Sequence, residues 1–144
     1  MSVVTVASFL RTRGDVVRST LTPLDLIGLA DIMLVPSQWG EPFGLVAAEA
    51  MSGGAVPIVF RDGGLPEVLG TDLSDNVVDS ASDMARRVNE LLGDSARRLQ
   101  DRAVGYRRAS SYFHVSRMAD ELDASLDRAL SRSTQRTEPR RLHR

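Results

Sequence analysis

The residues best suited to chemistry are two carboxylates, Glu41 and Glu49, which lie eight positions apart around a predicted turn. The apolar run at 32–35 is typical of a buried strand, and residues 45–51 predict a helix. The N–H groups at a helix N-terminus attract phosphate, and carboxylates accept hydrogen bonds from sugar hydroxyls. A phosphate cradle beside two carboxylates therefore suits a ligand with both groups, such as a nucleotide sugar.

A second turn, at 62–67, follows the apolar strand predicted at 56–60. Its glycines, Gly63 and Gly64, permit positive φ angles and a close approach of the backbone to a ligand. A purely structural turn is the competing interpretation. Ligands of parallel sheets bind beyond the carboxyl ends of the strands, which is where we expect both turns to lie.

The elements that must position these turns alternate between strands and helices. The predicted strands are 2–9, 32–35, 56–60 and a short edge strand at 76–78. The predicted helices are 22–30, 45–51, a helix capped by Ser80 or Ser82 that runs to Leu92, 99–106 with an interruption near Gly105, and 115–130. This alternation predicts βαβ units, and hence an α/β fold with a parallel sheet of three or four strands and flanking helices.

Composition narrows the class of protein further. A chain of 144 residues, 42% of them hydrophobic, is long enough for one domain with its own core. No membrane span or leader is visible, so we expect a cytoplasmic location. The absence of cysteine excludes disulfides, zinc–thiolate sites and thiol catalysis. The end of the chain, 131–144, holds five Arg and one Glu and is predicted to be a disordered tail, inert rather than a nucleic-acid or membrane contact.

Missing motifs exclude several other chemistries. No glycine-rich dinucleotide fingerprint follows the first strand, and Ser37 lacks the glycines of a hydrolase elbow. No Asp-x-Asp pair is present to hold a divalent cation, so we expect neither a metal nor another cofactor. Trp39 either stacks on a ligand or covers the core, and His114 is expected at the surface or as the cap of the following helix.

The motifs of both turns occur together in one known family. In that family's order, the matching segments are Pro36-Ser37, Glu41-Pro42-Phe43-Gly44-Leu45, Glu49, Gly54, Val56-Pro57 and Gly63-Gly64-Leu65-Pro66-Glu67. The E-x7-E pattern alone is common, but its combination with PFG and GGLPE is specific. From Val16 to Leu130 the chain resembles the C-terminal, donor-binding half of a GT-B glycosyltransferase of family 4, the retaining glycosyl transferases group 1. The resemblance implies a Rossmann-like sheet and a partial donor domain over residues 1–130.

The resemblance also implies a role for each residue of the site. Glu41, the catalytic candidate, would contact sugar hydroxyls near the anomeric centre, and Glu49 would bind the ribose. The donor would be a nucleotide-diphosphate sugar, whose hexose is transferred to an unknown acceptor without a metal. The substrate-binding residues implied by the family are Glu49, the backbone amides of Phe43, Gly44 and Leu45, and the turn at Gly63 and Gly64.

The chain departs from the family in its extent. It lacks the acceptor domain and the Arg and Lys that clamp the diphosphate; Lys is absent altogether, and Arg11, Arg13 and Arg18 stand in no clamp motif. We therefore predict a truncated or split member that needs a second polypeptide or self-association. The alternatives are a non-catalytic remnant that binds nucleotide or acts as an interaction module, and a sugar-nucleotide epimerase of the same fold.

Overall fold

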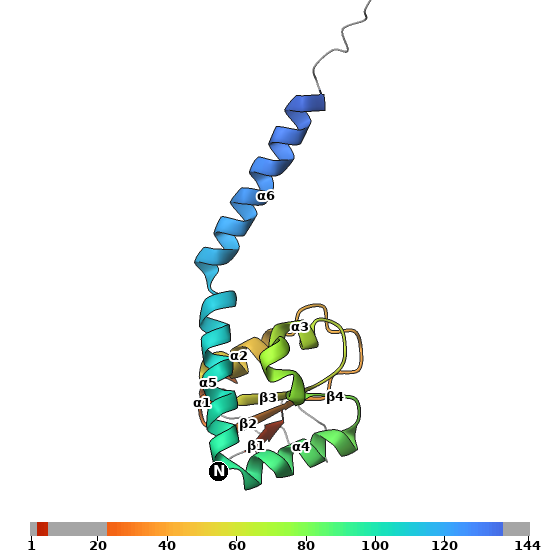
Figure 1. Cartoon of the computed structure of the whole chain (residues 1–144), viewed down its shortest axis with the longest axis vertical. Helices are drawn as coiled ribbons and strands as arrows, with labels where there is room; N and C mark the ends of the chain where they lie inside the picture. Colours follow the sequence, from red (N-terminus) through yellow and green to blue (C-terminus); the bar gives the residue numbers. More distant parts are fainter. Residues whose placement is uncertain (1–2, 6–22, 137–144) are drawn as a thin grey trace, which may run out of the picture. The chain divides into compact units, whose positions relative to one another are not determined.

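The computed structural model of the chain describes residues 3–5 and 23–136 (Figure 1). It divides into two compact units, Met1–Ser111 and Tyr112–Arg144. The end of the strand predicted at 2–9 lies outside the described residues. None of the described helices is long and apolar enough to cross a membrane.

The first unit is built on one parallel sheet. The strands are β1 (Val3–Thr5), β2 (Ile32–Val35), β3 (Val56–Phe60) and β4 (Val77–Val78), in the spatial order β1-β2-β3-β4. Each neighbouring pair is parallel. Every residue of β3 is buried, as expected for a strand covered on both faces. The predicted α/β fold with a parallel, Rossmann-like sheet and flanking helices is confirmed.

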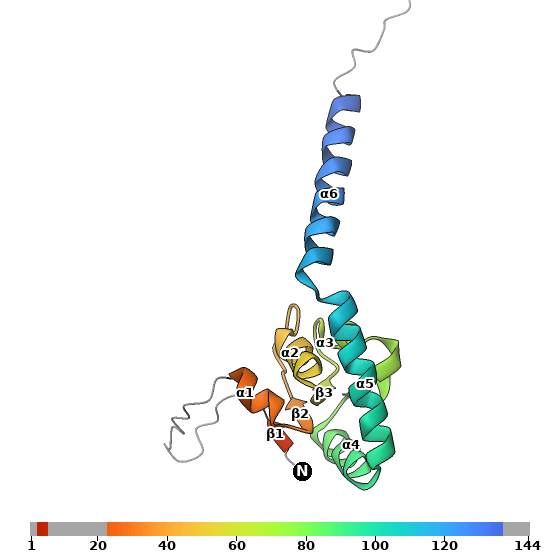
Figure 2. The ribbon, with the colours of Figure 1, turned by 90° about the vertical axis from the view of Figure 1, so that its left-hand side faces the viewer.

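Helices cover both faces of this sheet. They are α1 (Pro23–Gly28), α2 (Leu45–Gly53), α3 (Leu65–Leu69), the 3-10 helix η1 (Thr71–Asn76), α4 (Ala81–Gly93) and α5 (Ser95–Tyr112). One face carries Ile32, Ile58 and Phe60, which pack with Met84 and Leu91 of α4. α2 and α3 also contact the strands, and in both views the strands lie between α2 and α4 (Figure 1, Figure 2).

The ends of two helices follow from local chemistry. α2 ends where Gly54 takes a left-handed conformation, and the Gly54 N–H donates to carbonyls of the last turn. Ser80, rather than Ser82, caps α4, because its hydroxyl oxygen accepts the N–H of Asp83 at 3.1 Å. The predicted serine cap is therefore confirmed.

α5 differs from its prediction at Gly105. The helix runs through Gly105 without the predicted interruption, and its buried face contains Asp101, Gly105 and Ala109. Its large apolar residues are exposed instead, with Leu99 62% and Tyr106 55% accessible. The reason is steric: a Cβ at Gly105 would lie 3.1 Å from Cγ of Met51. Small residues face inward because α5 packs very close to the side chain of Met51 on α2.

A buried ionic cluster ties α4 to α5 and η1. Arg87 donates to Asp101 at 2.9 Å and to the side-chain oxygen of Asn76 at 2.8 Å. Arg97 donates to the second oxygen of Asp101 at 2.8 Å, and this hydrogen bond raises the pKa of Arg97. The side chains of Arg87 and Asp101 are 8% and 4% exposed. Among the described residues, no buried side-chain nitrogen or oxygen lacks a hydrogen-bond partner, so the cluster is fully satisfied.

The second unit contains α6 (Val115–Arg136). The helix begins at residue 115, as predicted. It continues past Leu130, the predicted end, into the segment from 131 onward that was predicted to be a disordered tail. The sequence has no Gly or Pro between Val115 and Pro139 to stop it. Residues 137–144 lie outside the described part of the chain. All five large apolar residues of its stripe are more than half exposed: Val115, Met118, Leu122, Leu126 and Leu130.

Candidate functional site

The two predicted turns follow neighbouring strands and bind each other. The first links β2 to α2, and the second links β3 to α3. The N–H of Gly64 donates to the carbonyl oxygen of Glu41 at 2.8 Å. The N–H of Gly40 donates to a carboxylate oxygen of Asp62 at 2.7 Å. The site is therefore a pair of joined turns at the carboxyl edge of the sheet, where open α/β folds bind ligands.

The glycines of the second turn are required by this contact. A Cβ at Gly63 would collide with the carbonyl oxygen of Glu41 and lie 2.7 Å from its nitrogen, and Gly63 has a φ of +49°. A Cβ at Gly64 would lie 2.7 Å from the carbonyl oxygen of Pro42. Packing of one turn on the other is thus sufficient to explain both glycines. Their contact with a ligand stays a prediction.

The first turn ends at the N-terminus of α2. Gly44 is the N-cap, with a φ of +87°, and its carbonyl oxygen accepts the N–H groups of Ala47 and Ala48. A Cβ at Gly44 would lie 2.6 Å from Cδ2 of Leu65, so this glycine also packs against the second turn. No side chain caps the first turn of α2. The predicted helix start is confirmed, and its N–H groups carry the positive end of the helix dipole.

The two carboxylates are not used to hold the fold. Glu41 lies in the first turn and Glu49 lies on α2, and both are half-buried. Neither side chain forms a hydrogen bond or ion pair with the other described residues. Trp39, in the same loop as Glu41, is 75% exposed. It therefore does not cover the core, and its stacking on a ligand stays a prediction.

Comparison with known proteins gives the family. Residues 19–108 match the family described as "Glycosyl transferases group 1". This chain belongs to that family. The matched segment contains both turns, α2 and most of α5, whereas α6 lies beyond it.

The family members most informative for this chain are similar to it over only part of their length. Spore coat protein SA of Bacillus subtilis is 32% identical over 100 residues, which cover 67% of this chain and 26% of the relative. Two proteins named D-inositol 3-phosphate glycosyltransferase are also similar. The one from Corynebacterium kroppenstedtii is 37% identical over 95 residues, covering 60% of this chain and 21% of the relative. The one from Mycolicibacterium smegmatis is 34% identical over 104 residues, covering 71% of this chain and 23% of the relative. The chain spans about a quarter of the length of these relatives.

Two charged residues of the site escaped the sequence analysis. Asp62 holds Gly40, as described above, and Arg61 forms an ion pair with Asp79 at 2.8 Å. Arg61 follows β3 and Asp79 follows β4, so this pair lies at the same carboxyl edge. Arg61 and Asp62 directly follow the strand predicted at 56–60, and this position could have identified them as site residues. The basic residues that the sequence analysis singled out at 11, 13 and 18 lie outside the described residues.

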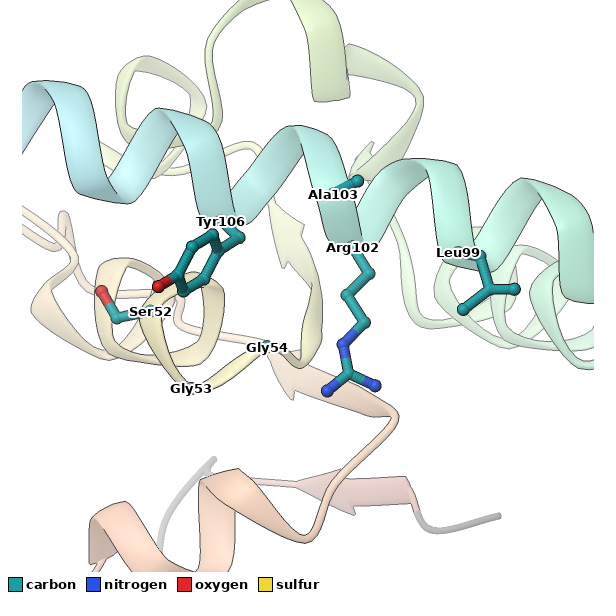
Figure 3. A pocket seen from close by; sticks show the side chains of 7 residues that line it. All are labelled: Ser52, Gly53, Gly54, Leu99, Arg102, Ala103 and Tyr106. Atoms are coloured by element: carbon teal, nitrogen blue, oxygen red, sulfur yellow. The ribbon is translucent and has the colours of Figure 1, made fainter.

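A hollow in this glycosyltransferase-family fold lies at the C-terminal end of α2, away from the two turns. Its volume is about 420 Å³, and it is lined by Ser52, Gly53, Gly54, Leu99, Arg102, Ala103 and Tyr106. Figure 3 shows Arg102 of α5 extending toward Gly54 at the end of α2. The C-terminus of a helix carries partial negative charge, which a guanidinium complements and a phosphate does not. This hollow lies at the opposite end of α2 from the donor site that the sequence predicts. Within the described ranges, no group of three or more acidic or His side chains could hold a metal ion.

Proposed function

We propose that this chain binds the nucleotide-diphosphate sugar of a retaining glycosyl transfer reaction at the turn between β2 and α2. One observation carries the proposal: two uncommitted carboxylates, Glu41 and Glu49, flank a helix start that no side chain caps. Membership of the glycosyl transferases group 1 supports it. Two relatives are themselves named glycosyltransferases.

Each part of the site has a distinct task in this proposal. Glu49 accepts hydrogen bonds from the ribose hydroxyls, and Glu41 accepts hydrogen bonds from the hexose near its anomeric carbon. The N–H groups at 43–45 contact sugar and diphosphate oxygens and stabilise the charge that develops on the leaving diphosphate. The GT-B fold of family 4, the absence of a metal requirement and a cytoplasmic location belong to the same proposal.

Transfer to an acceptor requires more than this site. The chain spans about a quarter of its relatives, and Arg61, a cation at this edge of the sheet, is paired with Asp79. We propose that a second polypeptide or a second copy supplies the acceptor surface and the diphosphate clamp. The same observations favour a second candidate function, a nucleotide-binding module without catalysis.

Isothermal titration of the full chain with UDP, GDP and ADP tests the proposal. We expect one nucleotide to bind and Glu49→Ala to weaken it about tenfold or more, since a hydrogen bond to a charged group contributes about 1.5–3 kcal/mol. Asp72→Ala, which removes an exposed carboxylate of η1, is the control and should bind as the unmutated chain does. Failure of all three nucleotides to bind would contradict the proposal.

Turnover of the matching nucleotide sugar separates the two candidate functions. Release of nucleotide from the sugar donor, lost in Glu41→Ala, indicates an enzyme. Binding without release indicates the non-catalytic module.

A further inference from the structure

Two hydrogen bonds join the loop that carries Glu41 to the second turn. On one side, the Glu41 carbonyl oxygen accepts the N–H of Gly64 at 2.8 Å. On the other side, the half-buried carboxylate of Asp62 accepts the N–H of Gly40 at 2.7 Å. Packing does little to hold the second side, since Gly40 is exposed and no atom lies within 4 Å of the place a Cβ on it would take.

This loop needs such a constraint more than most turns do. Gly40 has a φ of +66°, and glycine has the widest choice of backbone conformations. The N–H of Gly40 belongs to the peptide between Trp39 and Gly40, so losing its hydrogen bond would free that peptide, one residue before Glu41, to rotate. A carboxylate acceptor makes a stronger hydrogen bond than a neutral one, and the two bonds together bracket the Cα of Glu41.

We propose that Asp62 is a positioning residue, whose hydrogen bond to Gly40 sets the Glu41 turn in the conformation that binds the donor. Asp62 acts through the backbone of the neighbouring turn and need not contact the ligand. The ligand of Glu41 rests on the proposed function. The ordering of the loop by Asp62 does not depend on the proposed function, so the two proposals can be tested separately.

The test compares the full-length unmutated chain with Asp62→Ala and Asp62→Asn, all labelled with ¹⁵N. Asn keeps a side-chain oxygen that accepts the same hydrogen bond, so it serves as the rescue variant. Asp72→Ala removes an equal charge from η1 and is the matched control. In the free protein, Asp62→Ala should speed hydrogen exchange of the Gly40 amide by about ten- to a hundredfold, as expected for a lost charge-assisted bond. It should also lower the ¹⁵N order parameters of Gly40, Glu41 and Phe43, the residues at 40–43 that carry an amide N–H.

Both Asp62 variants should unfold at nearly the temperature of the unmutated chain, because β2, β3 and α2 keep their packing. Nucleotide-sugar affinity should fall about tenfold in Asp62→Ala, return largely in Asp62→Asn, and stay unchanged in Asp72→Ala. This pattern, with unchanged stability, distinguishes positioning from a role in the fold.

Two outcomes overturn the proposal. Unchanged order parameters at 40–43 in Asp62→Ala would show that the bond orders nothing, whether or not a nucleotide binds. Disordered residues 40–43 with unchanged affinity would show that the loop does not set the ligand site. If the unmutated chain binds no nucleotide sugar, the proposed function fails, and the order parameters alone decide the role of Asp62.

Discussion

Helices α4 and α6 have the same kind of sequence and very different surroundings. Each begins at a side-chain cap, each has an apolar face at the period of a helix, and each has an Arg–Glu pair one turn apart. In α4 the apolar residues Met84 and Leu91 are 6% and 0% exposed, against the sheet. In α6 the corresponding residue Leu122 is 59% exposed.

The difference shows that a helical period identifies an apolar face without identifying what covers it. The charged residues show the same contrast. Arg87 of α4 is buried in an ion pair with Asp101, whereas Arg117 of α6 pairs with Glu121 in the open and lies 4.4 Å from the centre of the Tyr112 ring. Three pairs of measurements, and a fourth on α4 alone, test how far this contrast extends to the energy of each helix.

The largest expected effect is at the ion pairs. Arg87→Ala should lower the free energy of unfolding by about 3 kcal/mol or more, because it leaves the buried Asp101 with only Arg97 as its cation. Arg117→Ala should cost less than about 1 kcal/mol, the usual value of an exposed pair. Urea unfolding followed by circular dichroism measures both. Equal costs would contradict the contrast between the helices.

The apolar positions should differ nearly as much. Leu91→Ala should cost about 2–5 kcal/mol through lost burial and the cavity left behind. Leu122→Ala should stay within about 0.5 kcal/mol, as exposed substitutions do. The same urea titrations report both values. A large cost at Leu122 would mean that another surface covers α6 in solution, and its dependence on protein concentration would identify a second copy.

The caps give a smaller difference. Ser80→Ala should cost about 1 kcal/mol, since the hydroxyl of Ser80 caps a helix that belongs to the core. His114 caps α6, its Nδ1 accepting the N–H of Ser116 at 3.3 Å, which confirms the role expected from the sequence. His114→Ala should reduce the helical signal of circular dichroism and leave the main unfolding transition in place. A shift of the main unfolding transition in His114→Ala would show that α6 unfolds together with the rest of the chain, and would contradict this prediction.

The smallest effect concerns acid stability at the start of α4. The Ser80 hydroxyl, followed by Arg86, lowers the pKa of Asp83 below its ordinary value of 3.8. Because the pKa is lower in the folded state, this stabilisation is complete above pH 3.8 and is lost as the pH falls through the folded value. Ser80→Ala should therefore lose less stability between neutral and acid pH than the unmutated chain. Unfolding titrations at several pH values measure the slopes, and parallel slopes would contradict the assignment.

The sequence was sufficient where local chemistry fixes an element. The bounds of β2 and β3 were predicted to the residue. Each strand is a continuous apolar run, and a proline or glycine lies close to its end. The start of α2 at Leu45 was predicted from the helical pattern at 45–51. These features depend on neighbours along the chain, which a sequence displays directly.

The sequence failed where size or a distant contact decides. On α5 an interruption was predicted near Gly105, yet the helix continues and Gly105 faces inward, where a Cβ would lie 3.1 Å from Cγ of Met51. Asp62 was missed because its partner, Gly40, lies 22 residues away on the preceding turn. The polarity of a side chain indicates neither how closely two helices pack nor which distant residue it binds.

By itself, the sequence determined the alternation of strands and helices, the parallel sheet and the motifs of the family, since each depends on side-chain type and spacing. Only the tertiary structure decided that Gly63 and Gly64 must be glycine, because the backbone of the Glu41 turn occupies the space of any Cβ. It also decided that the stripe of α4 is covered and that of α6 is exposed. These features depend on which surfaces come into contact in the folded chain. The residues of a single turn or helix do not determine that contact.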